Sequence, residues 1–137
     1  MKNMNAEEFS DVLIKQERML SYLGQVKGYF ENKPRKTDED WQIYIGLDMI
    51  ITEIECCTKN CRDIKRIYRW TYCVFRDALP LIDDTNLEKD VMAWTGKLYN
   101  AWQYMTPYVL RFYKRQDTSD VLYYLGFDGV VPQKIQN

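Results

Sequence analysis

Apolar residues recur at intervals of three and four positions through most of this chain, which is the spacing of amphipathic helices. The first set falls on one arc of about 140° when residues are placed at the 100° steps of a helix. It comprises Phe9, Val12, Leu13, Met19, Leu20, Leu23, Val26 and Phe30. Gly24 and Gly28 weaken the pattern, since each costs a helix about 1 kcal/mol relative to Ala. We predict a helix near residues 5–31, followed by a loop that contains Pro34.

Two further helices are predicted in the middle of the chain. The first is expected near 38–58, with Thr37 or Asp38 as its cap. The second is expected near 60–79, where Asn60 is a suitable N-cap and Pro80 ends the pattern. Their apolar stripes are offset by roughly 100°, which indicates a break or kink between them. One long helix over 38–79 is the alternative.

The most regular pattern lies near 86–115, after a loop whose acidic residues suit a helix start. Its apolar residues are separated by alternating steps of three and four, as in a heptad seam. They are Val91, Trp94, Leu98, Ala101, Met105, Tyr108 and Phe112, with Trp102 and Val109 at the edge. Pro107 lies away from this seam, so we expect it to bend the helix, with a break as the alternative.

A short helix near 118–125, ended by Gly126, is expected before a polar C-terminal tail. The predicted fold is therefore all-α: a bundle of four main amphipathic helices plus a short C-terminal helix. A length of 137 residues, with 46% hydrophobic and 28% charged residues, suits one domain over residues 1–137.

The chain shows no sign of export or of membrane insertion. Its first residues lack the apolar run of a signal peptide, and no stretch approaches the roughly 20 apolar residues that cross a bilayer. We therefore expect a cytoplasmic protein that does not contact the membrane, in which the cysteines are reduced.

Most kinds of catalytic chemistry are disfavoured by the residues that are missing. The chain contains no histidine, which removes the commonest general base and the usual nucleophile pairs. Its six scattered glycines form no phosphate-binding loop. Cys56, Cys57, Cys61 and Cys73 lack the paired spacing of a structural zinc site, so most are expected to pack in the core, with Cys73 on a polar face. We predict a protein that is not an enzyme and holds no cofactor or metal.

The charges are sharply divided along the chain, although the net charge is only −1. Residues 38–55 carry six acids and no base. The basic residues that follow fit one helical arc of roughly 120°, flanked by two aromatic residues. We predict that this basic stripe and its aromatic flanks bind a partner; the residues are Lys59, Arg62, Lys65, Arg66, Arg69, Arg76, Trp70 and Tyr72.

Three interpretations of the stripe remain open. In the first, the chain is a protein-interaction module, such as a small inhibitor or modulator of the phage or immunity type, which binds an acidic surface of another protein. In the second, it is an accessory nucleic-acid-binding protein whose aromatic flanks stack on bases, although its pI of about 5.5 is unlike the basic balance of such domains. In the third, the acidic and basic helices pair with each other, within one chain or in an antiparallel homodimer, and occupy the stripe.

Overall fold

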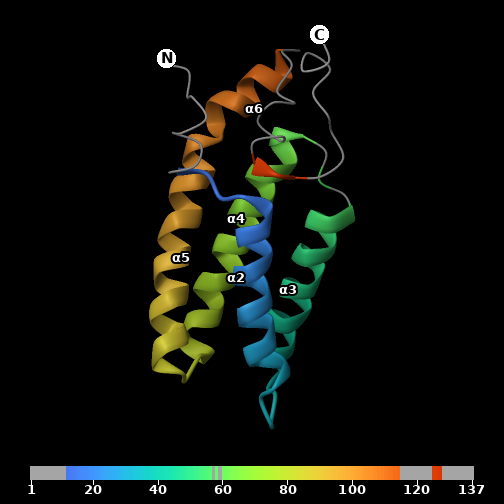
Figure 1. Cartoon of the computed structure of the whole chain (residues 1–137). Helices are drawn as coiled ribbons and strands as arrows, with labels where there is room; N and C mark the ends of the chain where they lie inside the picture. Colours follow the sequence, from blue (N-terminus) through green and yellow to red (C-terminus); the bar gives the residue numbers. More distant parts are fainter. Residues whose placement is uncertain (1–11, 57, 59, 115–124, 128–137) are drawn as a thin grey trace.

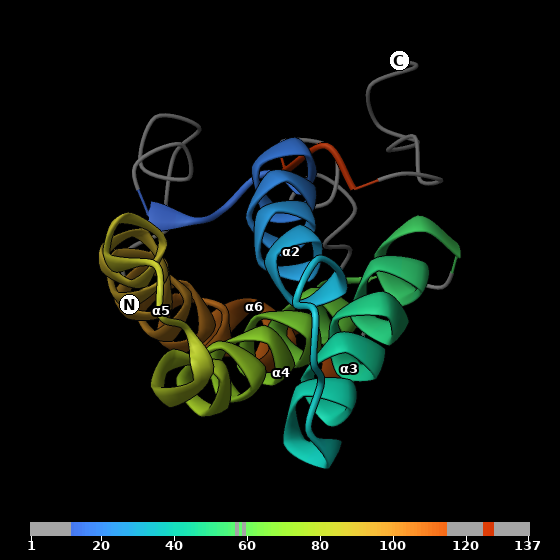
Figure 2. The ribbon, with the colours of Figure 1, turned by 90° about the horizontal axis from the view of Figure 1, so that it is seen from below.

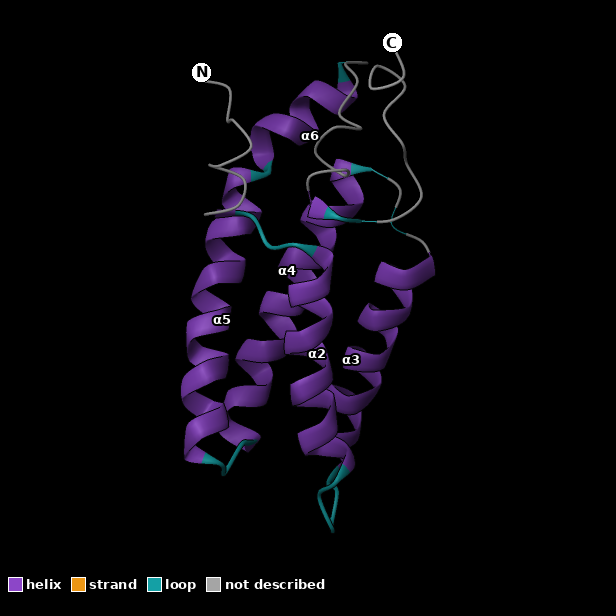
Figure 3. Ribbon diagram, viewed as in Figure 1, coloured by secondary structure: helices purple, strands orange, loops and turns teal. Residues whose placement is uncertain are grey.

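The computed structural model describes residues 12–56, 58, 60–114 and 125–127, and within these ranges it contains helices and no strand (Figure 3). The predicted all-α class is confirmed. The main helices are α2 (Gln16–Glu31), α3 (Asp38–Cys56), α4 (Cys61–Ala78) and α5 (Thr85–Tyr104). A short 3-10 helix, η1 (Leu79–Leu81), follows α4, and α6 (Thr106–Tyr113) follows α5.

The four main helices run alternately up and down beside one another (Figure 1). Seen along the bundle, α4 lies opposite α2, with α5 on one side of it and α3 on the other (Figure 2). Accordingly α4 packs against α3, α5 and α6, and α2 packs against α3 and α5. This arrangement is the up-and-down topology that short connections between antiparallel helices favour.

Large apolar side chains from every main helix fill the interior. Tyr68, Phe30 and Phe75 are among the largest fully buried side chains. In the predicted heptad seam, Leu98 and Met105 are fully buried, whereas Trp94 is only half-buried and stacks on Tyr22 with 4.4 Å between ring centroids. Phe112, the last residue of the predicted seam, has its side chain outside the described part of the chain.

The helix predicted near 5–31 is interrupted, because α2 begins only at Gln16 and residues 13–15 are not helical. Leu13 and Ile14 are nevertheless buried, so apolar residues continue through the break. The pattern of apolar positions therefore does not indicate where the helix is interrupted. The hydroxyl of Tyr68 holds this segment: it donates to the Ile14 carbonyl at 2.8 Å and accepts from the Ile14 N–H at 3.1 Å. Burial raises the pKa of this hydroxyl, so it stays protonated and keeps its donor role.

A break also separates α3 from α4, as the offset of their stripes indicates. The side chain of Asn60 caps α4 by accepting from the Asp63 N–H at 3.1 Å, which confirms the predicted cap. The alternative prediction of a single long helix over 38–79 is therefore wrong.

The helix predicted near 86–115 is divided into α5 and α6 by a turn at Met105. Pro107 lies in the first turn of α6, where the missing N–H has no intrahelical partner to lose. The expected bend at Pro107 is therefore wrong, and the alternative, a break in the helix, is what the structure shows. The segments expected to form the short helix near 118–125 and the polar tail lie almost wholly outside the described residues, apart from Leu125, Gly126 and Phe127.

The cysteines occupy different environments. Cys61 is buried, and its thiol sulfur lies 3.3 Å from the Tyr108 carbonyl oxygen, so it packs in the core as expected. Cys56 is exposed at the end of α3, and Cys73 is half-buried on α4. Cys57 lies outside the described residues.

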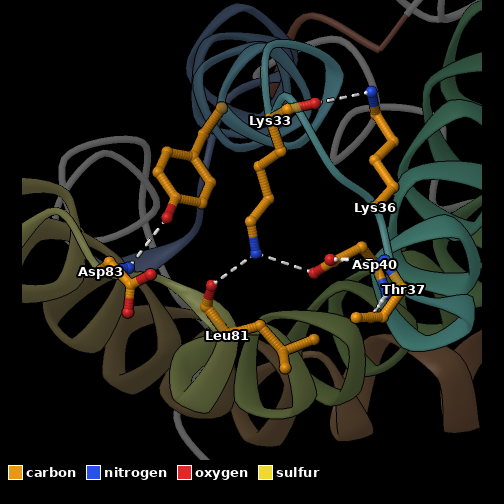
Figure 4. A network of polar contacts seen from close by, with 7 residues as sticks. Lys33, Lys36, Thr37, Asp40, Leu81 and Asp83 are labelled. Carbon is orange, nitrogen blue, oxygen red and sulfur yellow. Dashed lines mark hydrogen bonds and ion pairs between the residues drawn. The ribbon is translucent and has the colours of Figure 1, made fainter.

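A polar network joins the loop after α2 to η1 (Figure 4). The ammonium group of Lys33 contacts the Asp40 carboxylate at 2.9 Å and donates to the Leu81 carbonyl at 3.0 Å. Asp40 is only 2% exposed, and its second oxygen accepts from the Thr37 N–H at 2.9 Å. The Lys33 ammonium group, and to a smaller extent the Thr37 N–H, lower the pKa of the Asp40 carboxyl below its usual value. Nearby, the Asp83 N–H donates to the Tyr29 hydroxyl at 2.8 Å.

We expect Asp40→Asn to reduce the free energy of unfolding by about 1.5–3 kcal/mol at neutral pH, because Lys33 loses a charged partner. Folding lowers the pKa of Asp40, so its carboxylate stabilises the protein above the unfolded-state pKa of about 4. That contribution is lost as the pH falls through the lower folded-state pKa. Urea unfolding at a series of pH values should therefore show the two proteins converging between about pH 5 and pH 2.

Asp48→Asn is the matched control, because Asp48 pairs with Lys27 at 2.9 Å on the surface. An exposed pair of this kind is worth about 0–1 kcal/mol. Equal losses in the two variants, or a difference for Asp40→Asn that does not change with pH, would contradict the role assigned to the network.

A second prediction concerns Thr71, whose buried hydroxyl has no hydrogen-bond partner among the described residues. Thr71→Val keeps the shape of the side chain and removes the unsatisfied oxygen, so it should stabilise the protein by about 1 kcal/mol. Thr95→Val is the control, because the Thr95 hydroxyl donates to the Val91 carbonyl at 2.6 Å. Denaturant titration should show stabilisation in the first variant and none in the second.

Candidate functional site

The outer side of α4 carries the predicted basic stripe. Its arginines, Arg62, Arg66, Arg69 and Arg76, are all exposed, and Lys65 is half-buried. The opposite side of the same helix buries Ile64, Ile67, Tyr68, Thr71 and Phe75. Lys59, the first residue of the predicted stripe, lies outside the described residues. The structure therefore places the described part of the stripe on one solvent-facing side, as the sequence pattern predicts.

Along the edge next to α3, the stripe meets an acid of the preceding helix. Arg66 Nη2 lies 3.0 Å from Glu53 Oε2, and both side chains are partly exposed. Pairing between the acidic and basic helices thus occurs within one chain at this position. Exposed pairs of this kind are worth about 0–1 kcal/mol, so Arg66 is held only weakly.

Along the edge next to α5, the stripe meets aromatic rings from both helices. The Tyr72 ring of α4 lies 5.7 Å from Tyr99 and 6.2 Å from Trp102 of α5, measured between centroids. Tyr99 and Trp102 themselves pack edge to face at 5.8 Å. Tyr99 is 45% exposed, and the other two rings are half-buried. A patch of three adjoining rings therefore reaches the surface between the two helices.

Two arginines of the stripe lie over these rings. The guanidinium carbon of Arg69 is 5.4 Å from the Trp102 ring centroid, and that of Arg76 is 5.7 Å from the Tyr72 centroid. Arg76 Nε also lies 3.6 Å from Asp77. A cation over an aromatic face gains about 0.5–1 kcal/mol at an exposed site. We call this group the Arg–aromatic surface; it consists of Arg69, Tyr72, Arg76, Tyr99 and Trp102.

Of the predicted partner-binding residues, the structure brings Arg69, Tyr72 and Arg76 together. Trp70 is half-buried on the other flank of α4 and makes no ring contact with the three clustered aromatic residues. Tyr99 and Trp102 were not predicted as site residues, and Trp102 was assigned to the edge of the heptad seam. Their position follows from the packing of α5 beside α4, which periodicity within one helix does not determine.

The Arg–aromatic surface has the chemistry of an anion-recognition surface. Guanidinium groups can bind carboxylate or phosphate oxygens through two parallel hydrogen bonds. The rings behind them restrict the arginine side chains and offer flat apolar area to a ligand. None of its five residues is a histidine, a cysteine or a carboxylate.

Metal-ligating side chains do not gather in the part of the chain that the structure describes: nowhere do three or more Cys, Asp or Glu residues come together. In the same part, every helix is too short or too polar to cross a membrane. No family model, curated protein or solved structure matches this chain.

Proposed function

We propose that this chain is a non-enzymatic protein-interaction module, a small inhibitor or modulator that binds an acidic surface of another protein through the Arg–aromatic surface. The observation that carries the proposal is the placement of Arg69 and Arg76 over aromatic rings contributed by two different helices.

The composition of the surface matches that of binding hot spots in protein interfaces. Tyr, Trp and Arg are the residue types most enriched among side chains whose truncation weakens binding strongly. Here they are held on two packed helices, so little conformational entropy is lost when a partner binds. Arg62 and Arg66 lie further along the same side of α4, where exposed charges raise the association rate with an acidic partner.

A second candidate function is binding to single-stranded nucleic acid. The observation that favours it is the exposed ring of Tyr99 beside an arginine-rich helix, because bases stack on such rings while cations contact phosphates. Against it stand the exposed acids Asp38, Glu39 and Glu55, which make no ion pair with any described residue, on the helix that packs beside α4. They would repel a long polyanion that extends across the stripe.

Reversing two charges tests the proposed partner surface. We expect Arg69→Glu/Arg76→Glu to fold as the wild type does, since both side chains are exposed, and to lose the partner through charge repulsion. Arg18→Glu/Arg35→Glu is the matched control: it changes the net charge equally at exposed positions outside the surface. Tyr99→Ala should weaken binding by 10-fold or more, the loss of about 1.4 kcal/mol or more that marks a central interface side chain.

The measurement is quantitative affinity capture from the source cells, with circular dichroism to check folding. A protein captured by the wild type and the control but lost from Arg69→Glu/Arg76→Glu agrees with the proposal. Equal capture by both double variants contradicts it. A mobility-shift titration with random DNA and RNA at two salt concentrations tests the second candidate, which requires affinity that falls steeply with salt.

A further inference from the structure

The outward face of α3 carries a ridge of large apolar side chains that the fold leaves exposed. Trp41 is 47% exposed, Ile45 52% and Met49 51%. They are spaced four residues apart, so they fall within an arc of about 80° on the helix. Single exposed apolar residues are ordinary on protein surfaces, but three in one row form the type of ridge that packs into the groove of another helix. We call these three residues the α3 ridge.

Acidic residues border the ridge. Asp38, Asp48 and Glu55 are exposed on the same helix, and α3 contains no basic residue. Asp48 is paired with Lys27 of α2, whereas Asp38 and Glu55 make no ion pair with any described residue. Lys36 lies over the Trp41 ring at 5.1 Å, at the start of the helix. The face is therefore apolar along its centre, with the unpaired carboxylates of Asp38 and Glu55 near the two ends of α3.

We infer that the α3 ridge is a second docking surface, and that its occupant is a basic amphipathic helix of another protein. Such a helix would place its apolar stripe on Trp41, Ile45 and Met49 and its Lys or Arg side chains beside the acids. The contact would be the packing of one helix against another, in which the α3 ridge fits a groove between side chains of the partner helix and the flanking charges select the partner.

A second copy of the chain fits this face less well. Pairing α3 with α3 would bring two helices together that each carry six acids and no base. Like charges across an interface repel and oppose the gain from apolar burial. The inference is also independent of the Arg–aromatic surface, which lies at the α4–α5 boundary and has the opposite charge.

Two synthetic helical peptides, used with the full chain, test the inference. Both carry the same leucine stripe, and the remaining positions are lysine in one and glutamate in the other. We expect the lysine peptide to bind, with amide chemical-shift changes along α3, and the glutamate peptide to bind at least 10-fold more weakly. Fluorescence anisotropy of labelled peptides gives the affinities.

Variants of the chain then separate ridge binding from general attraction to acids. Ile45→Ser should weaken the lysine peptide 10-fold or more, whereas Met92→Ser, at an apolar residue that is 57% exposed on α5, should leave it unchanged. Arg69→Glu/Arg76→Glu should also leave it unchanged or strengthen it, so failure here is distinct from failure of the proposed function.

Equal effects of Ile45→Ser and Met92→Ser, or equal binding of the two peptides, would overturn the inference. So would a dimer, measured by light scattering, that Ile45→Ser dissociates, because the occupant would then be a second copy of this chain.

Discussion

The architecture depends on a conflict within α4 between an apolar side that must be buried and an arginine-rich side that must stay in water. Burying an unpaired guanidinium group costs more free energy than the net stability of a small domain. The helix can therefore be covered from one side only. In the bundle, α2 lies opposite α4, and α3 and α5 lie on its two sides (Figure 2). The apolar side chains of α4 are buried, and the arginines of the basic stripe are exposed. The candidate site is thus a consequence of how the core is closed.

Two buried polar groups then fix how the remaining segments meet this helix. The Tyr68 hydroxyl satisfies both the N–H and the carbonyl of Ile14, where the chain leaves helical geometry. Without such a partner, the buried backbone groups of this segment would carry the desolvation cost of unmade hydrogen bonds. In the loop after α2, the Lys33 ammonium group pairs with Asp40 and also donates to the Leu81 carbonyl at the end of η1. The Tyr68–Ile14 and Lys33–Leu81 contacts join residues 54 and 48 positions apart, so each helps to define the register of the helices.

The sequence was sufficient for features that arise within single helices. The period of apolar residues predicted the class and the main helices, and the Asn60 cap with the offset of two stripes predicted the break before α4. It was insufficient where long-range contacts decide the structure. Apolar periodicity does not reveal the interruption at residues 13–15, because Leu13 and Ile14 stay buried there. The N–H and the carbonyl of Ile14 are both hydrogen-bonded to the Tyr68 hydroxyl, 54 positions away.

The part of the candidate site that lies on one helix could be predicted from the sequence, and the part that depends on the packing of two helices could not. The basic stripe on α4 followed from its helical period, and its exposure agrees with the structure. The aromatic half of the Arg–aromatic surface comes from α5, and only the packing of two helices brings Trp102 beneath Arg69. Trp70, the other predicted aromatic flank of the stripe, is half-buried against the core and stays outside the cluster of Tyr72, Tyr99 and Trp102.

A net charge of −1 conceals two surfaces of opposite sign on adjoining helices. At physiological ionic strength, screening acts over about 8 Å, so a ligand responds to the face it approaches more than to the sum of all charges. A long nucleic acid laid along α4 would extend past the stripe toward the acids of α3, whereas a folded acidic protein can contact the Arg–aromatic surface alone. The division of charge between α3 and α4 therefore supports the proposed compact acidic partner over an extended polyanion, and the inferred docking surface on α3 would have the opposite charge preference.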